Sequence, residues 1–207
     1  MKKISLIFCI ISNVLMAQKI LTEWETSIKS ESIELQYRWV LIGDTLETRE
    51  MRSIFKIECP REDIIFNLSD DKRFKSWSVG VTKCKALNKN YNGWIMYSFF
   101  DIPMPFSDKD LIANYELKQK DRTTIIQVTA LPDYLPKKEG VERMKNYSAY
   151  WILEEKEWNK TLVKFHSIAY TKPVFPRFIQ DPLIQSLIIK SFEKLIILSE
   201  GKHLQSF

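Results

Sequence analysis

The ten residues DIPMPFSDKD, from Asp101 to Asp110, connect two apolar segments that both have the pattern of β-strands. Trp94–Phe100 precedes them, and in the segment that follows, four apolar side chains share one face: Leu111, Ala113, Tyr115 and Leu117. Pro103 and Pro105 hold the backbone near extended geometry and exclude a helix. The sequence therefore predicts a stiff, exposed turn between two strands, without catalytic residues.

Alternating apolar and polar residues predict further strands on both sides of this turn. Ile33–Leu41 is typical, because its apolar side chains fall on odd positions as far as Leu41. Gly43 and Asp44 predict a turn that makes a hairpin of the first two strands. The predicted strands are Ile33–Leu41, Glu47–Ile57, Val79–Leu87, Trp94–Ile102, Asp110–Lys118, Thr123–Leu131, Ser148–Glu155 and Thr161–Ala169.

Three short helices are predicted in the first half of the chain. The first covers Thr22–Lys29. Pro60, at a first helical position with two acids in the first turn, begins the second, which ends near Ser69. The third covers Lys72–Trp77.

A long helix is predicted at the end of the chain, over Asp181–Ser199. Asp181 is expected to cap it, with Pro182 in its first turn and Gly201 just beyond its end. Its apolar residues recur every three or four positions, so one face must lie on the sheet. They are Leu183, Leu187, Ile188, Phe192, Leu195 and Ile196.

These elements predict an α+β fold, in which a curved antiparallel sheet grips the long C-terminal helix. The chain has 207 residues, which favours one domain, and we place it at residues 18–207. Such a layout leaves room for an apolar pocket between sheet and helix. A solid, fully packed core is the alternative.

Residues 1–17 have the layout of an export signal. Lys2 and Lys3 precede a mainly apolar run from Ile4 to Met16, which is too short to span a bilayer, and Ala17 precedes polar Gln18. A buried N-terminal helix is the alternative. We therefore expect an exported protein, periplasmic if the source is a Gram-negative bacterium and otherwise secreted.

The net charge limits the classes of binding partner, and the cysteine content limits the possible disulfides. Removal of residues 1–17 takes away two lysines and no acid, which lowers the net charge from +5 to +3. The basic residues are scattered among acids, so we expect no nucleic-acid partner, although weak contact with an anionic membrane surface is open. We expect a monomer. Cys59 and Cys84 remain after cleavage, either paired or as two buried thiols.

Catalytic and metal-binding motifs are scarce. Of the two histidines, His203 lies near the terminus, so a site with two or three His ligands is excluded and no metal is expected. His166, in the middle of a predicted strand, is read as a hydrogen-bonded surface or core residue rather than a general base. Only 5 glycines and no Gly-X-Ser-X-Gly elbow are present. We expect no cofactor and assign no catalytic residue.

The order of several residues resembles the START (StAR-related lipid transfer) family of the Bet v 1-like group, over most of Trp24–Leu198. The resemblance is distributed rather than a single signature, and it departs from the family's pattern at Met104, Lys109 and Ala149, where Trp, Arg and Gly are common. The features that carry it are Trp24, the Ile33–Tyr37 strand, the Pro60 helix, Trp77, the turn Ser107–Asp110, the segment Arg143–Leu153 and the sequence VFPRFI at 174–179.

The resemblance implies a helix-grip fold whose sheet and C-terminal helix enclose a tunnel for a lipid or another apolar molecule. Arg143 is read as a tunnel-rim contact for a headgroup or, alternatively, as a surface ion pair with Glu139 or Glu142. Leu187, Ile188 and Phe192 are expected to form a lid. The predicted ligand-binding residues are Tyr97, Phe99, Leu111, Ala113, Tyr115, Arg143, Tyr150, Ile152, Phe165, Leu187, Ile188 and Phe192.

The sequence thus favours an exported carrier or sensor of a lipid or other hydrophobic small molecule. Two other classes stay open. One is a cavity-based enzyme of the Bet v 1-like group, of cyclase or hydrolase type. The other is an envelope interaction module with no ligand.

Overall fold

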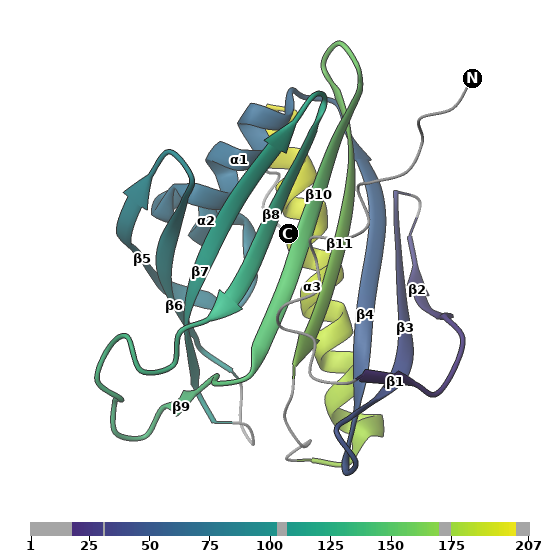
Figure 1. Cartoon of the computed structure of the whole chain (residues 1–207), viewed down its shortest axis with the longest axis vertical. Helices are drawn as coiled ribbons and strands as arrows, with labels where there is room; N and C mark the ends of the chain where they lie inside the picture. Colours follow the sequence, from purple (N-terminus) through teal and green to yellow (C-terminus); the bar gives the residue numbers. More distant parts are fainter. Residues whose placement is uncertain (1–17, 31, 103–106, 170–174, 202–207) are drawn as a thin grey trace, which may run out of the picture.

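The computed structural model describes residues 18–30, 32–102, 107–169 and 175–201. A curved, unclosed antiparallel sheet carries one long helix on one face (Figure 1). Along the sheet the strand order is β1-β3-β4-β11-β10-β8-β7-β6-β5, with β2 paired to β3 and β9 paired to β7. Within the described ranges, none of the helices is long and apolar enough to cross a membrane.

The strands of the sheet run close to the ranges that their alternation predicts. The hairpin of β3 and β4 and the pairing of β6 with β7 on either side of residues 101–108 are confirmed. Pro103 and Pro105 lie outside the described residues. The strands are β1 (Gln18–Ile20), β2 (Glu25–Lys29), β3 (Ile33–Ile42), β4 (Leu46–Ile57), β5 (Val81–Asn90), β6 (Gly93–Phe100), β7 (Lys109–Lys120), β8 (Thr123–Ala130), β9 (Glu142–Arg143), β10 (Tyr147–Glu157) and β11 (Lys160–Ala169).

The predicted helix over Thr22–Lys29 is wrong, because most of that segment is strand β2. Glu25 and Lys29 pair with Tyr37 and Glu34 of β3, so the backbone hydrogen bonds go to the sheet rather than along a helix. Trp24 lies just before this strand, under the guanidinium groups of Arg38 and Arg52 at 4.5 and 4.1 Å from its ring. Tertiary contacts therefore override a weak local helical preference.

Two short helices cover one end of the sheet, as predicted. Helix α1 (Arg61–Ser69) buries Ile64 and Leu68, and Pro60 is its N-cap rather than its first residue. Helix α2 (Asp71–Trp77) begins after Asp70, whose carboxylate accepts the Arg73 N–H. Capping of this kind satisfies a backbone donor that the helix leaves free.

The long helix α3 (Arg177–Ser199) begins four residues earlier than predicted, at the N-cap Pro176. Asp181 is therefore inside the helix, and its carboxylate forms an ion pair with Arg49 of β4 at 2.6 Å. Pro182 is also internal, where its missing N–H leaves one helical hydrogen bond unmade. Gly201 follows the helix with φ of +68°, the left-handed conformation that ends helices, as predicted.

Glycine is required at one position that bears on the sheet. A Cβ atom on Gly93 would lie 1.9 Å from the carbonyl oxygen of Tyr115, and Gly93 has a φ of 152°. The start of β6 therefore approaches β7 too closely for any side chain. This contact holds the register that places Trp94 beside Tyr115.

Candidate functional site

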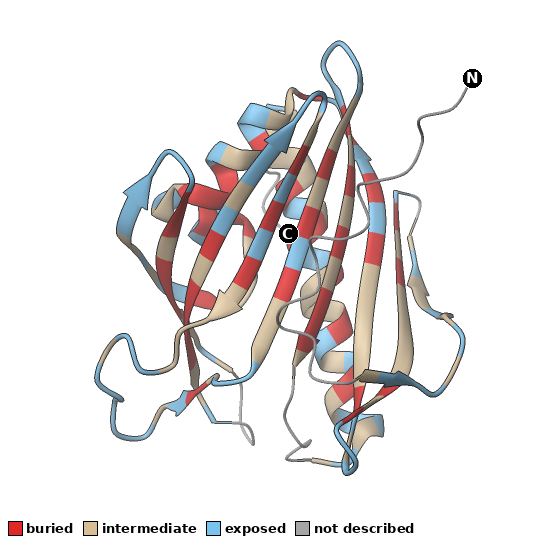
Figure 2. Cartoon of the chain, in the orientation of Figure 1, coloured by how far each residue is buried: buried red, intermediate tan, exposed pale blue. Residues whose placement is uncertain are grey.

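The candidate site is the concave face of the sheet, the face that α3 covers. Its side chains come from alternate positions: Leu111, Ala113 and Tyr115 of β7 point into the same core as Trp151 and Phe165 of β10 and β11. Along β8, β10 and β11, buried positions alternate with exposed or partly buried ones (Figure 2), so the intervening residues of each strand point to the convex face. The site is therefore a wall of odd-numbered residues on β7, β10 and β11, closed on the other side by α3.

At one end this wall packs tightly on α3. Phe192, 3% exposed, stacks on Phe55 with ring centroids 4.9 Å apart and lies 5.1 Å from Phe165. Leu153 and Val163, directly paired across β10 and β11, are fully buried in the same cluster. Aromatic contacts of this geometry leave no space for a ligand here.

Toward the other end, near the N-terminal half of α3, the wall includes two pairs of small side chains. Ala113 of β7 pairs with Ala130 of β8, and Ala149 of β10 pairs with Ser167 of β11. Several inward residues at this end are only partly buried, in contrast to the packed end. They are Met51, Cys84, Phe100, Ala130, Met144, Tyr147 and Ile188.

Two tyrosines lie at this end, buried Tyr115 and half-buried Tyr147, and neither hydroxyl forms a hydrogen bond within the described part of the chain. Burial raises the pKa of Tyr115 and that of Tyr147, and Tyr147 and Cys84 both contribute to the shift of Tyr115. The Tyr115 ring stacks on Trp94 at 4.9 Å, which fixes its direction. Each hydroxyl can donate one hydrogen bond and accept others, so both are available to a polar group of a molecule beside them.

The helix is fastened to the sheet beside this end by a charged and aromatic cluster. Arg49 of β4 pairs with Asp181 of α3 and lies over the Tyr37 ring at 4.0 Å. Arg177 lies over the Trp39 ring at 4.5 Å. These contacts position the N-terminal half of α3 over this end of the wall.

Six of the predicted ligand-binding residues lie together on this concave side. Leu111, Ala113, Tyr115, Phe165, Ile188 and Phe192 all belong to the main core cluster. Phe165 and Phe192 are part of the packed end. Leu187 is half-buried, and its carbonyl accepts a hydrogen bond from Ser191, whose hydroxyl also accepts the Val79 N–H near α2.

Four other predicted residues are placed on the convex face, so their assignment to an interior lining is corrected. Tyr97 and Phe99 alternate with inward-facing Met96 and Ser98 on β6, and Tyr150 and Ile152 alternate with inward-facing Trp151 on β10. Successive side chains of a strand point to opposite faces. The prediction took alternate positions on both strands but chose the wrong face, because alternation alone does not tell which face is inward.

Arg143 is neither a tunnel-rim contact nor a surface ion pair with Glu139 or Glu142. Its Nε and Nη2 donate to the two carboxylate oxygens of Asp110 at 2.6 and 3.0 Å. The remaining donors go to the carbonyls of Pro132, Leu135 and Pro136. The hydrogen bond to Asp110 raises the pKa of Arg143. Since all five donors of the guanidinium are used, none is left for a headgroup.

Sequence reasoning missed several residues at the end of the wall near the N-terminal half of α3, which we call the loose end. Ala130, Ala149, Ser167, Met51 and Tyr147 all face inward there, from four different strands. Once the strand pairing is known, these residues can be identified. Each is paired across the sheet with an inward-facing residue or lies two positions from one on the same strand. Alternation alone gives the faces of each strand, but not which face of one strand matches which face of the next.

His166 lies on the convex face and does not join the candidate site. It stacks on the Tyr150 ring at 4.5 Å, and its Nδ1 is 3.8 Å from Glu50 Oε1. Burial raises the pKa of Glu50, but His166 and Arg38 outweigh this effect, so the pKa is lowered overall. Arg38 also donates to Glu50 at 2.6 Å, which ties the carboxylate in a surface network.

The two cysteines of the described chain are free thiols. Burial raises the pKa of Cys59 to about 12 and that of Cys84 to about 11. Both are therefore protonated and weakly nucleophilic at neutral pH. In the described ranges, no three His, Cys, Asp or Glu side chains are grouped so that they could hold a metal ion.

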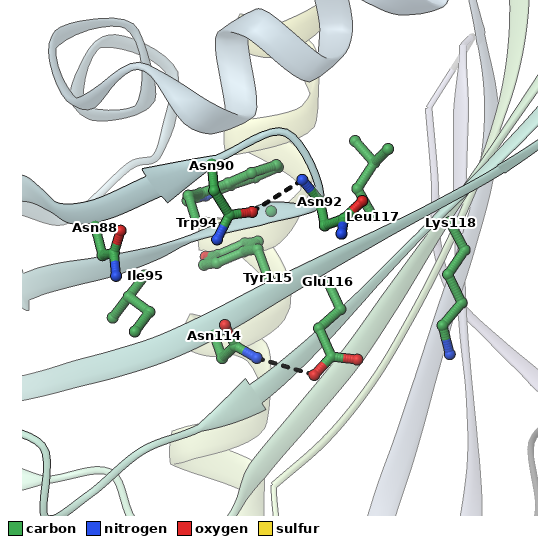
Figure 3. A pocket seen from close by; sticks show the side chains of 11 residues that line it. Asn88, Asn90, Asn92, Trp94, Ile95, Asn114, Tyr115, Glu116, Leu117 and Lys118 are labelled. Carbon is green, nitrogen blue, oxygen red and sulfur yellow. Dashed lines mark hydrogen bonds between the residues drawn. The ribbon is translucent and has the colours of Figure 1, made fainter.

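A groove of about 530 Å³ lies at the β5–β6 hairpin, where amide side chains lie beside Trp94, Tyr115 and Leu117 (Figure 3). Asn88, Asn90, Asn92 and Asn114 line it together with Glu116. Part of its hydrogen-bonding capacity is used internally, because Asn114 donates to Glu116 at 3.1 Å and the Asn92 N–H to Asn90 at 2.9 Å. The lining of the groove is therefore mixed, with amide groups beside aromatic and aliphatic side chains.

Comparison with known proteins agrees with this architecture. No protein-family model and no curated protein matches the chain. Among solved structures, the STAR-related lipid transfer protein from Xanthomonas axonopodis (fragment 25–204) superimposes with a TM-score of 0.73 at 21% identity, over 84% of this chain and 96% of that one. The chain has the START fold.

Two human START structures show the same likeness. StAR-related lipid transfer protein 5 gives a TM-score of 0.70 at 14% identity, over 86% of each chain. STARD10 gives 0.67 at 14% identity, over 84% of this chain and 71% of that one. The START fold is thus shared at low sequence identity, and the helix-grip arrangement expected from the sequence is confirmed.

Proposed function

We propose that this START-fold protein binds a lipid or another apolar small molecule between the sheet and α3, as a carrier or a sensor. The observation that carries the proposal is the contrast along the concave face. One end is filled by aromatic side chains around Phe192, whereas the other presents small residues, partly buried apolar groups and two tyrosines whose hydroxyls form no hydrogen bond with the described residues. The likeness to proteins described as lipid transfer proteins supports it.

Hydrophobic burial alone suffices for such binding. Burying about 300 Å² of apolar ligand surface at ~25 cal/mol per Å² contributes roughly 7 kcal/mol before the costs of association. We therefore expect affinities in the micromolar range or weaker. The hydroxyls of Tyr115 and Tyr147 then orient a polar end of the ligand rather than supply most of the affinity.

Substituting Ala130→Trp tests this site, because the indole would occupy the space beside Ala113. We expect binding of a pyrene-labelled fatty acid or a fluorescent sterol to weaken about tenfold or more, equivalent to ~1.4 kcal/mol. Fluorescence titration measures the affinity. A melting curve of the same sample shows that the fold survives the added volume.

Ile125→Trp is the matched control, since Ile125 is on the same strand but faces outward, paired with Ile152 and Lys118. Its affinity for both probes should equal that of the wild type. Equal affinity in Ala130→Trp, or failure of the wild type to take up any apolar probe, would overturn the proposed site.

We also propose that the chain is exported after removal of residues 1–17. Support comes from Lys2 and Lys3 ahead of the apolar run and from the polar start at Gln18. Expression of the whole chain in a Gram-negative host should yield a periplasmic protein whose intact mass corresponds to residues 18–207. A cytoplasmic protein that retains Met1–Ala17 would contradict export.

A further inference from the structure

A second pocket, of about 440 Å³, lies at β5 and β6, mainly on their convex side, and shares only Cys84 with the residues named for the candidate site. Its floor is the outward face of the two strands, where Lys85 pairs with Tyr97 and Lys83 with Phe99. Its other wall is the segment between β8 and β9, which contributes Leu135, Pro136 and Lys138. The volume is within the range of small-molecule sites.

The buried Arg143 holds this second wall in place. Three of its five hydrogen bonds go to carbonyls of the segment, those of Pro132, Leu135 and Pro136, and two go to Asp110. The backbone adds a hydrogen bond from the Leu131 N–H to the Ile112 carbonyl and another from the Glu142 N–H to the Asp108 carbonyl. The pocket is thus formed by a braced segment rather than by a loose loop.

The lining of the pocket is positively charged, because it contains lysines and no carboxylate. Lys83, Lys85 and Lys138 line it, and none of these three forms an ion pair with the described residues. Lys138 Nζ donates to the Tyr97 hydroxyl at 2.8 Å, and Lys83 Nζ lies 5.2 Å from the Phe99 ring centroid. Two ammonium groups are therefore held on aromatic residues two positions apart on one strand face.

Apart from Cys84 and the fully hydrogen-bonded Arg143, the remainder of the lining is apolar. Leu87, Leu135, Pro136 and the Tyr97 ring provide it. Lysines on an edge strand also discourage pairing with another sheet, but that role does not account for Lys138, which comes from the opposite wall. Convergent lysines over an apolar floor match a molecule that is anionic at one end and apolar at the other.

We infer that this pocket binds a small anionic amphiphile, with one carboxylate or phosphate between the three lysines and its apolar part against Tyr97, Leu135 and Pro136. The ligand class differs from that of the interior site, where the described wall carries no free cation. The wall of the interior site is on β7, β10 and β11, whereas the lysines of this pocket come from β5 and from the segment between β8 and β9, so each site can be emptied by its own substitutions.

Isothermal titration with octanoate tests the inference, with octanol as the neutral counterpart. We expect the wild type to bind octanoate and the Lys85→Gln/Lys138→Gln variant to bind it about tenfold more weakly, with no change for octanol. Raising NaCl from about 0.05 M to about 0.5 M should weaken octanoate binding to the wild type and have little effect on the double variant. Lys118→Gln, an exposed lysine of β7 outside the pocket, should behave as the wild type.

The interior site provides the decisive comparison. Ala130→Trp should retain octanoate binding at this pocket, and the double lysine variant should retain uptake of the apolar probes. Octanoate binding that is lost in Ala130→Trp and unchanged in the lysine variant would overturn the inference. So would lysine-dependent binding to phosphatidylglycerol vesicles with no binding of free octanoate, because the lysines would then serve a membrane surface.

Discussion

Arg143→Met is expected to lower the free energy of unfolding by about 3–5 kcal/mol. The side chains of Arg143 and Asp110 are 2% and 1% exposed, so the substitution leaves a buried carboxylate without a partner. It also removes the donors to three backbone carbonyls of the segment between β8 and β9. Urea denaturation followed by tryptophan fluorescence measures the change.

Lys160→Met is the matched control, because Lys160 pairs with Glu157 where both side chains are exposed, at 55% and 71%. Its loss should change the free energy of unfolding by less than about 1 kcal/mol. If Arg143→Met destabilises no more than Lys160→Met, the Asp110 pair does not brace the fold as described.

Phe192→Ala is expected to cost about 3–5 kcal/mol, since it removes the ring that packs on Phe55, Trp151 and Phe165. The melting temperature and the urea midpoint should both fall. Because the packed end supports α3 over the candidate site, probe binding should weaken as well. Phe178→Ala on the same helix, where the ring is 80% exposed, should leave stability within about 0.5 kcal/mol of the wild type. Equal effects of the two substitutions would contradict the packed end.

The sheet was predictable because its strands alternate strongly. Leu111, Ala113, Tyr115 and Leu117 share the concave face as their spacing indicates. Alternation on one strand does not give the register to the next, however, and it is the register that sends Tyr150 and Ile152 outward. Which residues face the interior could therefore be assigned only from the pairing of the strands.

Two further differences between the predicted and the observed structure have causes that the spacing of residues along the chain does not reveal. Asp181–Pro182 has the sequence of a helix start, but the helix extends back to Arg177 because Asp181 pairs with Arg49 and Arg177 packs on Trp39. The partner of Arg143 is 33 residues away, and only the parallel pairing of β7 with β9 brings Asp110 beside it. Asp108 is also bonded at this turn, where its carboxylate accepts the Ile102 N–H at 3.3 Å.

Photocrosslinking with a diazirine-labelled fatty acid, followed by peptide mass spectrometry, tests the central proposal most directly. Inward-facing residues of the loose end, such as Met51, Tyr147 and Ile188, should carry the label, and excess unlabelled ligand should prevent it. Labelling confined to convex-face residues such as Tyr150 and Ile152, or no competable labelling at all, would contradict a ligand held between the sheet and α3.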